Sequence, residues 1–350
     1  MTSSRYFPAL AESKLTRYFN FTALYFAEGL NMGMLFVGLP AWMAMNGKTP
    51  GEIGAFATAC AFPWTFKFVV APLMDRYTYL PMGRKRPWVL FGQIGLVASL
   101  VAMALVPDPL HNLSLFMAAA FLVSAFGAVQ DAATDGMAVD AIPDEEQATA
   151  NGLMGGARMI GSSLALALGS WVLNTYSFAA AMLAVAAMIA LMTLVPVLLR
   201  EQPGEKLAPW TQGQTSPAAE KMQIGNWAII LKSLFRLFSL RNSLLISLLL
   251  FLTQGAYNYF ETLLPLFAVK VSGWTNVSYS QAFATADLIG GIGGILVGGY
   301  LIERFGKKRM IGLYFALIML LVGALIVLQT YWTNAPFLYG FIVVYRWLNA

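Results

Sequence analysis

The sequence contains few of the residues on which disulfide frameworks, metal centres and water-exposed surfaces are built. It has one cysteine, Cys60, and one histidine, His111, and only 11% of its 350 residues are charged. One cysteine cannot form a disulfide within the chain, and one histidine cannot supply a histidine-based metal cluster. A soluble domain carries about 25% charged residues, so most of this surface is expected to face something other than water.

Long apolar runs take the place of the missing charges. Hydrophobic residues make up 58% of the chain, and several runs exceed the roughly 20 residues that a helix needs to cross a bilayer. Because helices satisfy their own backbone in lipid, the sequence predicts an all-α integral membrane protein. Ten spans are predicted, over 18–45, 51–74, 88–106, 113–140, 147–172, 177–199, 243–268, 277–302, 310–330 and 335–350.

The basic residues indicate the topology. With a cytoplasmic N-terminus, 17 of the 22 lysines and arginines fall in cytoplasmic segments, which is the positive-inside pattern. The net charge of +5 therefore reflects orientation in the membrane rather than a nucleic-acid partner. The first apolar run is long and has no small-residue cleavage site, so no cleavable signal peptide is predicted.

A charged loop occurs twice. Residues 72–86 and 298–309 each follow an apolar run and contain a carboxylate, an arginine, a glycine and a basic cluster, and their carboxylates Asp75 and Glu303 lie 228 positions apart. Segments 26–29 and 252–255 repeat at a similar offset of 226 positions. The chain is therefore predicted to be a duplicated membrane unit, as in many transporters.

The predicted organisation has three parts. An N-terminal six-helix bundle covers 1–200, a cytoplasmic linker covers 201–242, and a partial C-terminal bundle with helices seven to ten covers 243–350. The polar segment 201–221 indicates a flexible connector. Residues 226–241 form either a helix lying on the membrane surface or an early start of helix seven. Equal repeats would require two more helices, so the second repeat is expected to be truncated, with about ten helices present.

These features resemble the major facilitator superfamily. The second loop fits the family pattern closely, whereas the first has Ala71 where glycine is usual and six residues between Arg76 and Gly83. Residues 62–93 and 129–161 resemble the family of AmpG-like muropeptide permeases and acetyl-coenzyme A transporters. The resemblance implies two six-helix repeats and secondary active transport by alternating access, with the substrate bound between the halves.

The resemblance also implies the cargo and the energy source. A muropeptide is favoured, and another anionic solute (acetyl-coenzyme A, a pterin) or a sugar is the alternative. No P-loop is present, so ATP is not expected to drive this chain directly. We expect an inward symporter that is coupled to a proton gradient through one of Glu28, Asp131, Asp135 or Glu261. No cofactor, catalytic residue or metal is expected. We expect a monomer in the inner membrane that has a small-molecule substrate and the lipid bilayer as partners. A membrane enzyme or a non-transporting sensor is the competing interpretation, since fold does not fix function.

Two polar stripes are candidates for the substrate and proton pathway. Ionisable groups inside spans are costly and therefore functional candidates, and these stripes lie on symmetry-related helices. They line a cavity or make structural hydrogen bonds between helices. The first stripe is Tyr25, Glu28 and Asn31 on helix one, and the second is Gln254, Tyr257, Asn258 and Glu261 on helix seven.

Charged residues on helices two, four and five complete the predicted pathway. Lys67 requires a carboxylate partner, which is Asp131 or Asp135, four positions apart on helix four. The pair either switches during transport or takes up a proton, or it is a static pair that holds helices two and four together. Arg158 on helix five binds an anionic group of the substrate or neutralises Glu28. Asp287 and Arg346 are weaker candidates.

The duplicated loops are the predicted gate. In the family that the chain resembles, these positions hold the cytoplasmic side closed, and anchoring by positive charge is the simpler alternative. Glycines on helices five and eight, among them Gly156, Gly290 and Gly294, are expected to allow close helix approach. The gating residues are Asp75, Arg76, Gly83 and Arg84 in the first copy, and Glu303, Arg304, Gly306 and Lys307 in the second.

Overall fold

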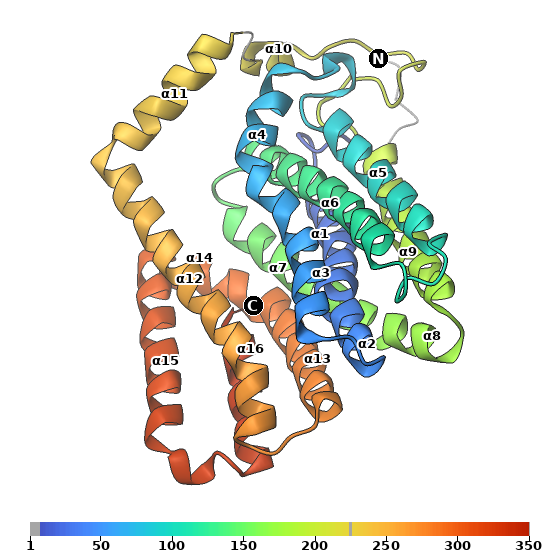
Figure 1. The fold of residues 1–350 in the computed structure, drawn as a ribbon. Helices are drawn as coiled ribbons and strands as arrows, with labels where there is room; N and C mark the ends of the chain where they lie inside the picture. Colours follow the sequence, from blue (N-terminus) through green and yellow to red (C-terminus); the bar gives the residue numbers. More distant parts are fainter. Residues whose placement is uncertain (1–7, 224–225, 350) are drawn as a thin grey trace. The chain divides into compact units, whose positions relative to one another are not determined.

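The structure, a computed structural model, describes residues 8–223 and 226–349 as helices and connecting segments (Figure 1). Eight helices in this described part are long and apolar enough to cross a membrane, so the predicted all-α membrane architecture is confirmed. They are Lys14–Met45, Pro50–Arg76, Arg86–Ala104, Leu113–Ala141, Gln147–Thr175, Phe178–Leu198, Gln281–Phe305 and Lys308–Val327. The other two predicted spans contain a helix of 30 residues, Arg241–Lys270, and one of 15 residues, Ala335–Asn349.

The elements follow one another in this order: α1 (Lys14–Met32), η1 (Gly33–Gly38), α2 (Leu39–Met45), α3 (Pro50–Ala61), η2 (Phe62–Phe66), α4 (Lys67–Arg76), η3 (Leu80–Met82), α5 (Arg86–Ala104), α6 (Leu113–Ala141), α7 (Gln147–Leu164), η4 (Ala165–Gly169), α8 (Ser170–Thr175), α9 (Phe178–Leu198), α10 (Pro217–Met222), α11 (Trp227–Ser239), α12 (Arg241–Lys270), α13 (Asn276–Gly293), η5 (Gly294–Gly298), α14 (Gly299–Phe305), α15 (Lys307–Val327), η6 (Gln329–Tyr331) and α16 (Ala335–Asn349).

Local sequence signals begin several of these helices. Thr49 and Glu52 form a reciprocal capping box at the start of α3, and Pro50 occupies the first turn, where no backbone donor is needed. Ser177 accepts the backbone N–H of Ala180 at 3.1 Å at the start of α9. These contacts satisfy amide groups that the helices themselves leave without partners.

Four predicted spans are not regular helices throughout. The first, fifth and eighth contain the π-helical segments η1, η4 and η5, each with at least one glycine. The second is interrupted by the 3₁₀ segment η2, where Pro63 removes a backbone donor, and resumes as α4. Irregular helix geometry of this kind is frequent at functional sites.

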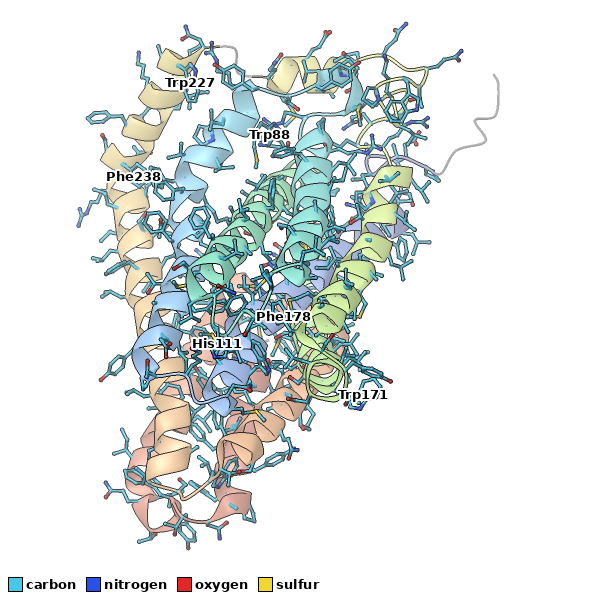
Figure 2. The ribbon with its side chains drawn as sticks, turned by 45° about the vertical axis from the view of Figure 1, so that its right-hand side comes forward. Trp88, His111, Trp171, Phe178, Trp227 and Phe238 are labelled. Atoms are coloured by element: carbon cyan, nitrogen blue, oxygen red, sulfur yellow. The ribbon has the colours of Figure 1, made fainter. Side chains whose placement is uncertain are left out.

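Contacts divide the chain into two units. The first contains Met1–Gln223 and Gly291–Gly306. In it, α1 packs on α7, and α5 packs on both α6 and α9 (Figure 1). Its buried core includes Leu30, Phe56 and Phe116. Figure 2 shows Trp88 near one end of this unit and His111 and Phe178 toward the other.

The second unit contains Ile224–Gly290 and Lys307–Asn349. Its core lies where α16 meets α12 and α13, with Phe341 and Tyr345 packed against Phe260. Many large apolar side chains on α12 and α15 are exposed, as expected for surfaces that contact lipid.

The linker differs from the predicted flexible connector. The linker up to Gln223 belongs to the first unit, and Glu201, Glu205 and Ser216 are buried within it, because the linker bonds to the basic loop, as described below. The segment after it forms α11, along which Trp227 and Phe238 lie (Figure 2). Leu240, with an extended ψ of 125°, separates α11 from α12, so α11 is a separate helix and not an early part of helix seven.

Candidate functional site

Five charged side chains and a tyrosine form a cluster inside the first unit. Lys67, the first residue of α4, makes an ion pair with Asp131 on α6. Its Nζ also lies 3.8 Å from Oδ2 of Asp135. The two aspartates are one turn apart and therefore share a face of α6. The predicted pairing of Lys67 is confirmed, with Asp131 as the direct partner.

Aromatic residues hold this ion pair in place. Tyr25 on α1 donates from its hydroxyl to Oδ1 of Asp135 at 2.5 Å. The ammonium of Lys67 lies 5.3 Å from the ring centre of Trp64, a cation–π contact. The indole N–H of Trp64 in turn donates to Oγ of Ser124 at 2.8 Å. Lys67 is thus fixed at the point where the interrupted second span resumes.

A second ion pair lies beside the first. Oε1 of Glu28 on α1 is 3.5 Å from Nη1 of Arg158 on α7, and the two side chains are 3% and 48% exposed. The other oxygen of Glu28, Oε2, is buried without a hydrogen-bond partner among the described residues. Asp131 and Asp135 also act on Glu28 electrostatically. A buried carboxylate oxygen without a hydrogen-bond partner is costly.

The cluster has an unequal number of charges. It contains three carboxylates (Glu28, Asp131 and Asp135) and two cations (Lys67 and Arg158). Since uncompensated charge is costly in a low-dielectric interior, one additional proton would balance the cluster. This arrangement is chemically suited to binding and releasing a proton.

The stripe predicted on helix one contacts other helices in this structure. Glu28 and Asn31 are both buried, and Nδ2 of Asn31 lies 2.8 Å from the position that a Cβ on Gly127 of α6 would occupy. Tyr25 is half-buried and bonds to α6 as described. The role of these three residues in lining a cavity stays a prediction.

The second unit contains a matching group. Arg346 on α16 forms an ion pair with Asp287 on α13, and both side chains are mostly buried. Nη1 of Arg346 donates to the hydroxyl of Tyr257 on α12 at 3.0 Å, and the guanidinium lies 4.4 Å from the ring centre of Phe283. The group therefore joins three helices.

Three other residues of helix seven were predicted for the pathway. Gln254 is on α12 with an exposed side chain. The side chains of Asn258 and Glu261 lie outside the described residues. Their predicted place in the pathway stays a prediction.

The first loop motif forms an ion-pair network. Arg84 binds Asp140 at the end of α6 through Nε and Nη2, at 2.8 and 2.7 Å. Oδ1 of Asp75 accepts from Arg84 Nη1 at 3.1 Å and from Lys85 Nζ at 2.6 Å. Two-pronged arginine–carboxylate contacts are among the stronger charged interactions, so the loop is tied to the ends of α4 and α6.

A linker carboxylate completes this network. Glu201 accepts the backbone N–H groups of Arg84 and Lys85, at 2.8 and 2.7 Å, and that of Arg86. Burial raises the pKa of Glu201, although the three donors act in the opposite direction. Gly83 has φ of 106°, and a Cβ there would lie 2.8 Å from the carboxyl carbon of Glu201. Glycine is required at this position for both reasons.

Arg86 holds the linker from the other side. Its buried guanidinium donates to the carbonyls of Pro196 and Val197 at the end of α9, at 2.7 and 2.8 Å. It also donates to Lys206 and Leu207 in the linker, at 3.0 and 2.7 Å. Arg86 therefore satisfies helix-end carbonyls that have no partner within α9.

The second loop motif reaches α7. The carboxylate of Glu303 on α14 accepts from the hydroxyl of Thr149 in the first turn of α7, the end of a helix that favours negative charge. Nη1 of Arg304 donates to the hydroxyl of Tyr300 at 2.6 Å. Gly306 has φ of 84° and ends α14.

Arg76 and Lys307 are the remaining residues of the two motifs. The guanidinium of Arg76 lies 5.3 Å from the ring centre of Tyr77, and its carbonyl accepts from Nε2 of Gln223 at 3.5 Å. Lys307 is the first residue of α15, and its side chain lies outside the described residues. A gating role for either motif stays a prediction.

Glycines bring α7 close to the middle of the eighth predicted span. A Cβ on Gly156 would lie 2.4 Å from the carbonyl oxygen of Gly291 and 2.3 Å from Ile295 Cγ1. A Cβ on Gly291 would lie 2.8 Å from the carbonyl oxygen of Gly156. The predicted close approach of helices five and eight is confirmed at this point.

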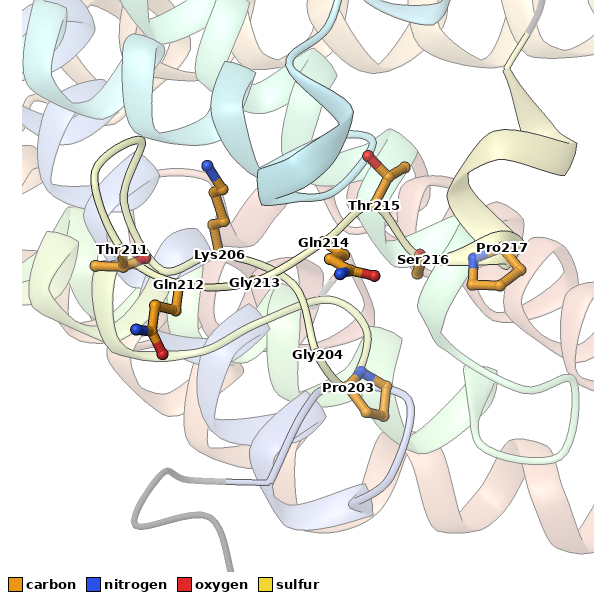
Figure 3. Close-up of a pocket in the computed structure, with 10 residues that line it drawn as sticks. All are labelled: Pro203, Gly204, Lys206, Thr211, Gln212, Gly213, Gln214, Thr215, Ser216 and Pro217. Atoms are coloured by element: carbon orange, nitrogen blue, oxygen red, sulfur yellow. The ribbon is translucent and has the colours of Figure 1, made fainter. Parts of the chain in front are cut away.

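Two cavities lie apart from the charged clusters. One, of about 650 Å³, is formed by the linker between Pro203 and Pro217, which turns back on itself (Figure 3). The other, of about 690 Å³, lies in the second unit beside Trp274 and Tyr339. Neither contains the pathway residues predicted from the sequence.

Sequence reasoning missed several residues of these networks. Glu201, Glu205 and Arg86 were not among the candidates, nor was the pair of Arg17 with Glu146 at 2.7 Å. Glu201 could have been found from the sequence, because it is an acidic residue directly after a span, on the same predicted side of the membrane as the basic loop. The remaining partners are set by tertiary contacts that spacing alone does not indicate.

The comparisons with known proteins agree with this architecture. A family model described as Major Facilitator Superfamily matches residues 21–346. The chain is 26% identical over 284 residues to the anhydromuropeptide permeases of Escherichia coli K12 and O157:H7, covering 81% of this chain and 55% of each permease. It is 34% identical over 126 residues to an uncharacterized Haemophilus influenzae protein, covering 36% of this chain and 29% of that protein. The chain thus spans about half the length of the curated permeases that it matches.

Proposed function

This chain belongs to the major facilitator superfamily, and we propose that it is a secondary active transporter that works by alternating access. Two relatives are named anhydromuropeptide permeases, which supports a muropeptide as the cargo. The candidate membrane spans support a multi-pass protein of the inner membrane. The distribution of basic residues supports a cytoplasmic N-terminus.

We further propose that transport is coupled to protons through Glu28. The single observation that carries this proposal is the unbalanced cluster, with three carboxylates, two cations and an unpartnered Oε2 on Glu28. A proton on Oε2 makes Glu28 neutral and removes its attraction for Arg158. The half-exposed guanidinium then becomes available to an anionic group of the cargo. Release of the proton and the cargo restores the ion pair between Glu28 and Arg158.

Arg158 supports a second candidate cargo. Its guanidinium is half-exposed although Glu28 lies within 3.5 Å, and arginine suits carboxylates and phosphates alike. Another anionic solute, such as acetyl-coenzyme A or a pterin, is therefore the alternative to a muropeptide. The two candidate cargoes are separated by testing which unlabelled compound competes with labelled muropeptide for uptake.

Uptake by the full-length protein in proteoliposomes tests the proposal. An inward proton gradient should drive accumulation of muropeptide, and a protonophore should abolish it. Glu28→Gln, which mimics the protonated state, should abolish accumulation but retain exchange between labelled and unlabelled cargo, since exchange needs no net proton movement. The exposed Glu145→Gln serves as the matched control and should behave as wild type.

Three other outcomes would overturn the proposed proton-coupled transport through Glu28. Gradient-driven uptake by Glu28→Gln at the wild-type level removes Glu28 as the proton carrier. Turnover of substrate in detergent, without any gradient, indicates a membrane enzyme. Ligand binding with neither uptake nor turnover indicates a sensor.

A further inference from the structure

Helix α11 has no role in the mechanism proposed above. It begins at Trp227 and ends at Ser239, so it is about 20 Å long. Leu240 has an extended backbone, and the chain changes direction there before α12 begins at Arg241 (Figure 1). The direction of α11 is therefore not set by that of α12.

Two sides of α11 carry different chemistry. Phe235 and Phe238, three positions apart, share one side of the helix and are 77% and 56% exposed. Lys232 and Arg236, four positions apart, share another side, and both side chains are exposed. The two pairs point roughly 110° apart around the helix axis. An apolar side with a basic side next to it is typical of helices that lie at a membrane surface.

The basic residues around α11 have no counter-charge nearby in the chain. From position 221 to position 260 the sequence has four basic residues and no acidic one. All four side chains are exposed, and none of them makes an ion pair with another described residue. They are Lys221, Lys232, Arg236 and Arg241. This segment therefore presents an uncompensated positive charge to an external partner.

The neighbouring helix places α11 beside lipid. Only Leu240 separates α11 from α12, and the first turns of α12 expose the apolar side chains of Leu244, Leu245 and Ile246. An exposed apolar surface of this kind is expected to contact the bilayer. One end of α11 is therefore held at the edge of the bilayer.

A bilayer that contains anionic lipids meets the requirements of both sides of α11. The phenylalanine rings leave water for the boundary between headgroups and acyl chains. The basic side chains reach the phosphates of the headgroups, and each lysine or arginine near an anionic surface strengthens binding about fivefold. A neutral bilayer would accommodate the phenylalanines but would leave the cations without counter-charge.

We propose that α11 lies on the cytoplasmic surface of the membrane and binds anionic lipid headgroups through Lys232, Arg236 and Arg241. The linker is then attached at two places, because Glu201 is bound to the basic loop and α11 is bound to lipid. Neither the cargo nor the proton takes part in this contact, so it does not depend on the proposed transport function.

Quenching of a fluorophore by lipid tests the proposal with the full-length protein in vesicles. Cys60 is the only cysteine of the chain, so a Cys60→Ala background allows one label, placed either at Phe235→Cys or at Ser233→Cys on the opposite side of α11. The vesicles contain phosphatidylcholine, nitroxide-labelled phosphatidylcholine as the quencher, and increasing amounts of phosphatidylglycerol. We expect phosphatidylglycerol to increase quenching at position 235, and quenching there to exceed that at position 233 at least about twofold.

Neutral variants test the contact with headgroups. Lys232→Gln and Arg236→Gln should each lower the ratio of lipid-bound to free α11 about fivefold in vesicles with phosphatidylglycerol, and neither should change it in pure phosphatidylcholine. Lys14→Gln is the matched control, because Lys14 is an exposed cation on the same predicted side of the membrane but not on α11. It should behave as wild type. If Phe235→Cys does not fold, Phe238→Cys labels the same side of the helix.

Two results would overturn the proposal. Equal quenching at position 235 with and without phosphatidylglycerol, or equal effects of Lys14→Gln and Arg236→Gln, overturns the binding of anionic lipid. Absence of lipid quenching at position 235 overturns the location at the membrane surface. Iodide in solution then distinguishes a helix exposed to water, which it quenches, from one covered by protein, which it does not.

Discussion

Arg346 on α16 pairs with Asp287 on α13, in the tenth and eighth predicted spans, and Asp131 pairs with Lys67 in the corresponding fourth and second spans. The cation and the carboxylate have exchanged helices. In both units a tyrosine bonds to a charged residue of the fourth or tenth span: Tyr25 donates to Asp135, and Tyr257 accepts from Arg346. Each pair need only be neutral to be buried, so the repeat preserves the pairing without preserving the residues.

Loss of either partner of the buried ion pair in the second unit should destabilise the protein. In the second unit, Asp287→Asn or Arg346→Gln leaves one buried charge without its partner and should lower the free energy of unfolding by about 3–5 kcal/mol. The double variant should lose less than the sum of the two. Unfolding of the four proteins in detergent measures this coupling. As a control, Lys48→Gln breaks a more exposed pair with Glu52 and should change stability little; strictly additive effects of Asp287 and Arg346 would contradict the pairing.

Gly83→Ala should disturb the cytoplasmic loop. The backbone there has φ of 106° and ψ of 170°, a region that costs other residues about 1–3 kcal/mol, and the new Cβ would displace Glu201. We expect a lower unfolding temperature and faster proteolysis of the linker. Gly54→Ala is the matched control, because nothing lies within 4 Å of its Cβ and alanine favours a helix. Identical behaviour of the two variants would show that the Gly83–Glu201 contact is unimportant.

Glu205 should make linker docking depend on pH. Burial raises the pKa of the Glu205 carboxyl to about 7, above its usual value of about 4.3. Between these values the folded protein binds more protons than the unfolded chain, so the contribution of Glu205 to stability falls as pH rises through this window. Glu205→Gln cannot titrate and loses one accepting oxygen at every pH.

The measurement is the difference in unfolding temperature between wild type and Glu205→Gln from pH 4.5 to 8. That difference should shift in favour of the variant as pH rises from about 4.5 and should level off above about pH 7. A pH-independent difference would mean that Glu205 does not change its protonation on folding in this range.

Gly156→Ala should block the close approach of α7 to the middle of the eighth span. Its Cβ would meet the carbonyl oxygen of Gly291 and Ile295 at under 2.5 Å, and neither backbone can move without its helix. We expect muropeptide uptake to fall at least about tenfold, as for other small changes in helix position that misalign a site. Gly298→Ala, with nothing within 4 Å, should keep wild-type uptake; loss of uptake in Gly298→Ala alone would contradict this interpretation.

Much of the architecture could be predicted from the sequence, because lipid imposes simple requirements. Long apolar runs must be helices, and the positions of the basic residues and the repeated loop indicate the repeat. The Lys67–Asp131 pair could be predicted because a cation inside a span needs a carboxylate, and few are available. The approach of Gly156 to Gly291 followed from glycines on two helices.

The contacts of the linker could not be predicted in the same way. Its composition is polar and rich in proline and glycine, which indicates a flexible segment. Burial of Glu201 depends on three consecutive N–H groups and a left-handed glycine more than a hundred residues earlier in the chain. The stripe on helix one has the same limitation: spacing places Glu28 and Asn31 on one face but does not indicate which helix covers it.

The guanidinium of Arg86 donates hydrogen bonds to both the end of α9 and the linker, and this has a practical consequence. Dividing the protein into separately expressed halves at residue 200 would remove the hydrogen bonds from Arg86 to the carbonyls of Lys206 and Leu207. The backbone N–H groups of residues 84–86 would also lose their acceptor, Glu201. A cut after Gln223 would keep all the hydrogen bonds of Glu201 and Arg86 within the N-terminal fragment. Complementation between two such fragments should therefore succeed with the later boundary and fail with the earlier one.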